Sequence, residues 1–88
     1  MSQPIRQYRL KLIAANTPGS LERVLNNSRS GGFAVDNFSA SLCVERNQYL
    51  IDLQVSGGNS QNNLIIALLQ ESDIRSLTPY RKGMSAYL

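Results

Sequence analysis

The sequence of 88 residues contains no histidine and no tryptophan, and it has a single cysteine, Cys43. Without histidine there is no imidazole for a Ser-His-Asp site and no His ligand for zinc. One thiol cannot close an intramolecular disulfide or supply the two ligands of a paired-thiol metal carrier. The acidic residues share no motif, and no base accompanies Cys43. We therefore expect a protein that is not an enzyme, with no metal and no cofactor on this chain.

Long apolar runs are also missing. No stretch approaches the ~18 apolar residues of a membrane span, and the segment Met1 to Arg6 lacks the apolar stretch of a secretory signal. We therefore expect a cytoplasmic protein with no membrane part. The net charge is only +3, and the basic residues are divided between the two ends of the chain. A nucleic-acid partner is not expected, because nucleic-acid binders gather Lys and Arg on one face.

The length leaves room for one domain. A domain of this size buries only about 60 to 65% of the surface that its unfolded chain exposes, so its core is thin. We therefore expect the chain to form an oligomer.

Hydrophobic periodicity predicts six elements. Apolar residues alternate with polar ones in three segments and recur at helical spacing in two others. Thr17 is expected to cap the first helix, with Pro18 at its first position. Phe33 and Val35 lie on the opposite phase to Phe38, which indicates a bulge near Asp36 and Asn37. The predicted elements are a strand over 8–14, a helix over 18–30, a strand over 33–44, a strand over 49–55, a helix from Asn59 or Ser60 to near Ser72, and a strand over 74–78. In the second helix Leu64, Ile65, Leu68 and Leu69 recur at helical spacing.

This order is typical of the α+β ferredoxin-like βαββαβ fold, a four-stranded antiparallel sheet with two helices on one face. The predicted domain covers residues 7–79, and residues 80–88, which have no period, are predicted to be a flexible or partner-docking tail. The other face of the sheet is either solvated or paired with a second subunit. Ile13 and Leu50 on that face favour pairing.

RNA-recognition modules share this order of elements and stack bases on aromatic residues of the central strands. Here the strand over 48–53 lacks the basic, glycine and interleaved aromatic residues of those modules, and Tyr49 is expected on the core face. RNA binding is therefore not favoured.

The junction from Asn16 to Leu21 points to a ligand. Gly19, Ser20 and Leu21 would place unpaired N–H groups at a helix start, with Gly19 permitting close approach, an arrangement that suits a carboxylate such as that of an amino acid. Asn16 would add a side-chain contact. The alternative is that these residues simply begin a helix.

The pattern Asn-x-Pro-Gly-x-Leu-x-Arg-Val over 16–24, followed by Gly-Phe-x-Val over 32–35 and Phe38, resembles the amino-acid-binding ACT domain. More narrowly, it resembles the small regulatory subunit of acetolactate (acetohydroxyacid) synthase in its short single-domain form. The resemblance implies a homodimer that binds a small amino-acid effector such as valine at the interface. The effector residues it implies are Asn16, Pro18, Gly19, Ser20 and Leu21 of one subunit and Phe33, Ala34 and Val35 across the dimer.

The resemblance also implies a catalytic partner. The large subunit of acetolactate synthase carries thiamine diphosphate, Mg²⁺ and FAD and serves branched-chain amino acid biosynthesis, toward valine, leucine and isoleucine. The small subunit is expected to bind and activate it. The competing interpretation is a free-standing ACT-domain amino-acid sensor that regulates another enzyme.

The sequence departs from that family at the second half of its motif. The family usually has Arg-Gly-aromatic-Asn-Ile, whereas this chain has Gly-Gly-Phe-Ala-Val over 31–35. Ala34 thus replaces the Asn expected to contact the effector. Losing a hydrogen bond to a charged group costs about 1.5 to 3 kcal/mol, so we expect weak or no valine feedback.

Overall fold

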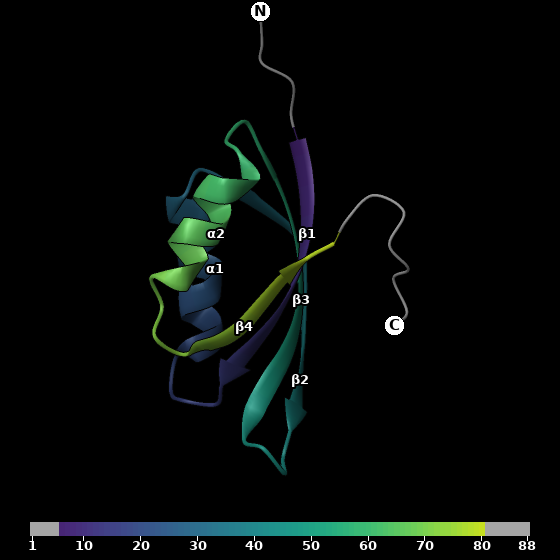
Figure 1. The fold of residues 1–88 in the computed structure, drawn as a ribbon, viewed down its shortest axis with the longest axis vertical. Helices are drawn as coiled ribbons and strands as arrows, with labels where there is room; N and C mark the ends of the chain where they lie inside the picture. Colours follow the sequence, from purple (N-terminus) through teal and green to yellow (C-terminus); the bar gives the residue numbers. More distant parts are fainter. Residues whose placement is uncertain (1–5, 81–88) are drawn as a thin grey trace, which may run out of the picture.

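The computed structural model describes residues 6–80. Within them, four strands form one antiparallel sheet in the order β2-β3-β1-β4, and both helices lie on the same side of it (Figure 1). This is the predicted ferredoxin-like fold. The elements are β1 (Arg6–Ala15), α1 (Ser20–Ser30), β2 (Ala34–Cys43), β3 (Gln48–Gly57), α2 (Gln61–Leu69) and β4 (Ile74–Pro79).

The core lies between the sheet and the two helices. On the central strands, Leu10 of β1 is opposite Leu53 of β3, and Leu12 is opposite Ile51. These side chains are buried because alternate residues of a strand share one face, here the face that the helices cover. The buried apolar residues are Leu10, Leu12, Ala14, Val24, Phe33, Ile51, Leu53, Val55, Leu64 and Leu68.

The predicted bulge in the second strand is confirmed. Val35 pairs with Val55 and Phe38 pairs with Leu53, so three steps along β2 match two steps along β3. The extra residue lets both apolar side chains pack against the core although their sequence separation is odd.

The start of α1 differs from the prediction. The helix begins at Ser20, not Pro18, and its N-cap is Gly19 (φ 79°, ψ 5°), which makes no side-chain cap. Thr17 does not cap the helix, because its hydroxyl donates to the Asp73 carboxylate at 2.5 Å. Pro18 and Gly19 therefore form a turn before the helix.

The start of α2 agrees with the prediction, whereas its end does not. The Ser60 Oγ accepts a hydrogen bond from the Asn63 N–H at 3.3 Å and so caps the helix. The helix ends at Leu69 rather than near Ser72, because the next residues form the turn into β4. Leu69, which continues the helical spacing of Leu64 and Leu68, is 55% exposed and lies outside the core.

The opposite side of the sheet, here called the helix-free face, carries the alternate residues of the central strands. Arg9 binds Asp52 through two hydrogen bonds of 3.0 and 2.6 Å, and its guanidinium lies 4.5 Å from the ring centre of Tyr80. The Tyr80 N–H also donates to the Arg9 carbonyl at 2.9 Å. Tyr80, predicted to begin a tail, therefore continues the sheet edge, while the rest of that predicted tail, residues 81–88, lies outside the described residues.

Candidate functional site

The loop after β1 holds the first half of the candidate effector site. The Ser20 N–H, predicted to be unpaired, donates to the Thr17 carbonyl at 3.1 Å. Within residues 6–80, the N–H groups of Gly19 and Leu21 have no acceptor. Two of the three predicted amides are thus unpaired at the positive end of α1.

Asn16 and Gly19 have structural partners of their own. The Asn16 Nδ2 donates to Oδ1 of Asn47 at 3.1 Å, which ties this loop to the turn between β2 and β3. A Cβ on Gly19 would lie 2.9 Å from Nη1 of Arg23 and 3.7 Å from Oε2 of Glu22. In this structure the space beside Gly19 is therefore filled by neighbouring side chains, and a ligand that approaches the glycine must displace them.

Arg23 anchors this loop to the turn between α2 and β4. Its Nη1 donates to the Pro18 carbonyl at 2.9 Å, and its Nη2 donates to the Thr17 hydroxyl at 3.0 Å and to the Asp73 carboxylate. Its Nε lies 3.0 Å from Oε2 of Glu71. Thr17, Arg23, Glu71 and Asp73, called the Arg23 cluster below, hold together two loops that are far apart in the sequence.

Two members of the Arg23 cluster, Arg23 and Asp73, have pKa values shifted toward their charged forms. The Thr17 hydroxyl, followed by the Arg23 guanidinium, holds the pKa of Asp73 below its ordinary value. The same carboxylate, followed by Glu71, raises the pKa of Arg23. One cation thus faces two carboxylates beside the unpaired amides, so a zwitterion, with both an ammonium and a carboxylate, fits the local charge better than a simple anion.

Ser20 and Leu21 face inward. Ser20 is 2% exposed and its Oγ has no hydrogen-bond partner within residues 6–80, while Leu21 packs against the core. Their side chains therefore help to fix the start of α1 against the core, and of their two N–H groups only that of Leu21 lacks an acceptor within residues 6–80.

The entry to β2 holds the second half of the candidate site. Phe33 is buried and packs edge-on against Tyr8, with ring centres 6.1 Å apart. Val35 is partly buried against the core, and Ala34, opposite Ser56, is exposed. Of the three predicted residues, Ala34 is therefore the one that a ligand reaches most readily.

The two halves lie at opposite ends of the sheet. Ala34 pairs with Ser56, which pairs with Gln7 near the start of β1, whereas the loop follows Ala15 at its other end. The eight residue steps between these rows correspond to roughly 26 Å at about 3.3 Å per residue. One chain does not bring its two halves together.

Sequence reasoning missed the Arg23 cluster as a unit. Arg23 was present in the motif, but nothing in the local pattern connects it to Glu71 and Asp73, about fifty residues later. The two carboxylates just before β4 were the only sequence feature that could have indicated partners for Arg23. The sheet brings them to it, because the turn before β4 lies beside the end of β1, where the Ala15 N–H donates to the Asp73 carbonyl at 2.9 Å.

Three further features bear on RNA, metal and membrane binding in the described part of the chain. Tyr8 and Tyr49 pack against the core, and the helix-free side of β1 and β3 carries no aromatic residue between Arg9 and Gln54. No group of three or more metal-ligating His, Cys, Asp or Glu side chains occurs within residues 6–80. No helix there is long and apolar enough to cross a membrane.

No family model and no curated protein sequence matches the chain. An uncharacterized protein from Thermotoga maritima matches in structure with a TM-score of 0.64 and 20% identity over 89% of this chain and 100% of that one. The C-terminal domain of the MgtC protein from Mycobacterium tuberculosis gives 0.65 and 10% identity over 98% of each. Formyltetrahydrofolate deformylase from Burkholderia mallei gives 0.61 and 13% identity over 86% of this chain and 28% of the deformylase. The chain shares its fold with these three proteins.

Proposed function

We propose that this chain is a non-catalytic ACT-domain regulatory subunit that binds and activates the catalytic subunit of acetolactate synthase. The observation that carries the proposal is the separation of the two motif halves, 16–21 and 33–35, at opposite ends of one sheet. A site that needs both halves is complete only when a second copy supplies the missing one. This is the division across a dimer that the sequence resemblance implies.

The edge strand β2 offers a way to form that dimer. It is ten residues long, and its stretch from Phe38 to Cys43 contains neither a charge nor a proline. Such an edge is a template for another strand, because charges and prolines are the usual protection. Antiparallel pairing of two β2 strands would put Ala34 of one copy at the end of the partner's sheet where the partner's effector loop lies.

The charge at the loop supports an amino acid as the effector. Open amides at the start of α1 suit its carboxylate, and the carboxylates of the Arg23 cluster suit its ammonium. Ala34 offers neither donor nor acceptor from its side chain, so we expect weak or no valine feedback.

The match to the deformylase is compatible with this role. There the shared fold accounts for 28% of an enzyme's chain, so the fold can accompany a catalytic unit. The alternative proposal is a free-standing amino-acid sensor for another enzyme, which the open amides would serve equally well.

The test is to mix the purified chain with a thiamine-diphosphate-dependent acetolactate synthase large subunit. We expect the two to co-elute and the turnover to rise. The Leu53→Asp variant is the matched control, because Leu53 is fully buried and an unfolded chain should not activate. Separate elution with unchanged turnover would reject the proposal, and saturable amino-acid binding by the isolated chain would then favour the sensor.

A further inference from the structure

We propose that the helix-free face of the sheet packs against the same face of a second copy. This interface is distinct from the β2 edge and does not depend on the proposed function. It would add a second step of self-association to any edge-to-edge dimer.

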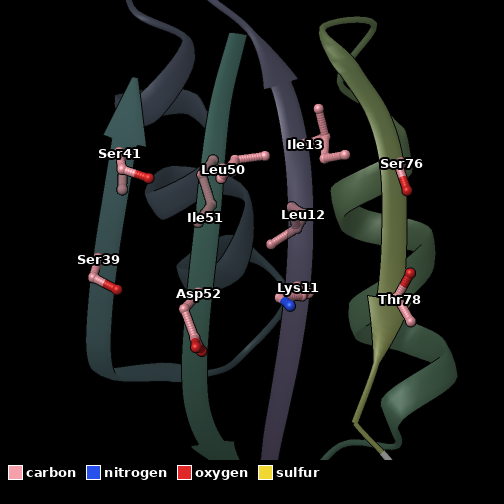
Figure 2. A pocket seen from close by; sticks show the side chains of 11 residues that line it. Lys11, Leu12, Ile13, Ser39, Ser41, Leu50, Ile51, Asp52, Ser76 and Thr78 are labelled. Carbon is pink, nitrogen blue, oxygen red and sulfur yellow. The ribbon is translucent and has the colours of Figure 1, made fainter. Parts of the chain in front are cut away.

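The face has an apolar centre beside a hollow. Figure 2 shows Leu50 and Ile13 on the two central strands, where they are direct cross-strand partners. Leu50 is 47% exposed. The hollow that these residues help to line has a volume of about 430 Å³. In a single copy this apolar pair borders solvent and has no apolar side chain packed over it.

The two outer strands present short side chains on this face. Their hydroxyl groups border the hollow from both sides (Figure 2). Because these side chains are short, a second sheet can approach to about 10 Å, the usual spacing of packed sheets. They are Ser39 and Ser41 on β2 and Ser76 and Thr78 on β4.

The charge pattern of the face is complementary to itself. Lys11 is directly opposite Asp52, one row along from Ile13 and Leu50. A two-fold axis that runs parallel to the strands between β1 and β3 places β1 of one copy over β3 of the other. Lys11 then lies over the second copy's Asp52, and Ile13 lies over its Leu50. The same symmetry repeats both contacts, as a dimer of identical subunits requires.

The size of the face sets the expected strength. Four strands about 4.8 Å apart and six residue steps of about 3.3 Å give roughly 400 Å² of projected area per copy. This is at the small end of specific interfaces, and Arg9 leaves each face with an excess positive charge. We therefore expect weak association, with a dissociation constant of about 10 to 100 μM.

Sedimentation of the full chain between about 10 μM and 1 mM measures this step. Leu50→Asp should weaken it at least tenfold, because the new carboxylate lies on the apolar centre beside Asp52. Ile66→Asp is the matched control: Ile66 is 58% exposed but lies on α2, so the association should be unchanged.

A charge exchange tests the symmetry directly. Lys11→Glu makes the pair of residues 11 and 52 wholly acidic, and Asp52→Lys makes it wholly basic. Each variant alone should therefore lose the face-to-face association. An equimolar mixture should recover it as a mixed dimer. Because Asp52→Lys also removes the partner of Arg9, its fold is checked by circular dichroism. If it does not fold, Lys11→Glu is compared with Lys11→Arg, which should retain the association.

Three results would overturn the proposal. One is a wild-type chain that shows no such step at 1 mM, and another is an association that Leu50→Asp leaves intact. The third is a charge mixture that does not associate. If Leu50→Asp abolishes only the binding of a catalytic subunit, the face belongs to that larger partner instead.

Discussion

Gly19 has a backbone conformation that other residues rarely adopt. Its φ of 79° lies in the left-handed region, where a Cβ costs about 1 to 2 kcal/mol. A Cβ would also lie 2.9 Å from Nη1 of Arg23. The glycine is therefore required by the turn and by the path of Arg23 to the Pro18 carbonyl, whatever ligand binds nearby.

We expect Gly19→Ala to lower the free energy of unfolding by about 1 to 2 kcal/mol, measured by urea denaturation. The control is Gly58→Ala, because Gly58 precedes α2 and its φ is not positive. Equal stability of the two variants would show that the loop adapts to a side chain.

Ser20 buries a hydroxyl without a partner, whereas Ser28 on the same helix donates to the Val24 carbonyl at 2.9 Å. An unsatisfied buried polar group costs about 1 to 3 kcal/mol. Ser20→Ala should therefore raise the midpoint of thermal unfolding, and Ser28→Ala should raise it less or not at all. A lower midpoint for Ser20→Ala would mean that an ordered water or a ligand satisfies this hydroxyl.

Under the proposed function, Ala34 is the residue at which we expect the effector affinity to change. If Ala34 replaces an amide that contacts the effector, Ala34→Asn restores a hydrogen bond of about 1.5 to 3 kcal/mol to a charged group. We expect valine to bind at least tenfold more tightly, as measured by calorimetry on the assembled enzyme. Asn in place of Ser39, on the helix-free face of the same strand, is the control and should leave valine binding unchanged.

Among the elements, the loop after β1 and the turn before β4 are coupled by the Arg23 cluster. Asp73 is the acceptor that both Thr17 and Arg23 share. Its pKa in the folded chain lies below its ordinary value, so its contribution to stability is complete above the unfolded pKa of about 3.9. As the pH falls through the folded-state pKa, that contribution is lost.

Asp73→Asn should therefore lower stability at pH 7 and make the loss of stability on acidification shallower than in the wild type. Thr17→Val removes the first cause of the lowered pKa and should change the slope in the same direction. Thr78→Val, on the exposed face of β4, is its control. Denaturant unfolding between about pH 7 and 2 measures these slopes, and parallel curves for Asp73→Asn and the wild type would contradict the coupling.

The elements were predictable where one short segment contains all the information. The alternation of Leu10, Leu12 and Ala14 predicts β1, and the phase change between Val35 and Phe38 predicts the bulge. The start of α1 was not predictable in this way, because Thr17 has its partner 56 residues away. Leu69 has the helical spacing of Leu64 and Leu68, but it is the last residue of α2 and is exposed.

At the scale of the whole molecule, the arrangement of the candidate site could not be predicted from local sequence patterns. Its residues could be named from the motif, but their separation follows from the sheet order β2-β3-β1-β4 and its antiparallel register. The helix-free face has the same origin, since Lys11 and Asp52 become neighbours only through the pairing of β1 with β3. In both cases the missing information was which distant strands lie side by side.

The roughly 26 Å between the loop and the entry to β2 has a genetic consequence if two copies share each effector site. A chain impaired at Gly19 and a chain impaired at Val35 would each fail alone. In a mixed dimer, the intact loop of one chain and the intact strand of the other combine at one of the two sites, while both defects fall in the other site. Co-expression of the two variants should therefore restore half of the effector response in each mixed dimer, whereas two defects within one chain should not be rescued by each other.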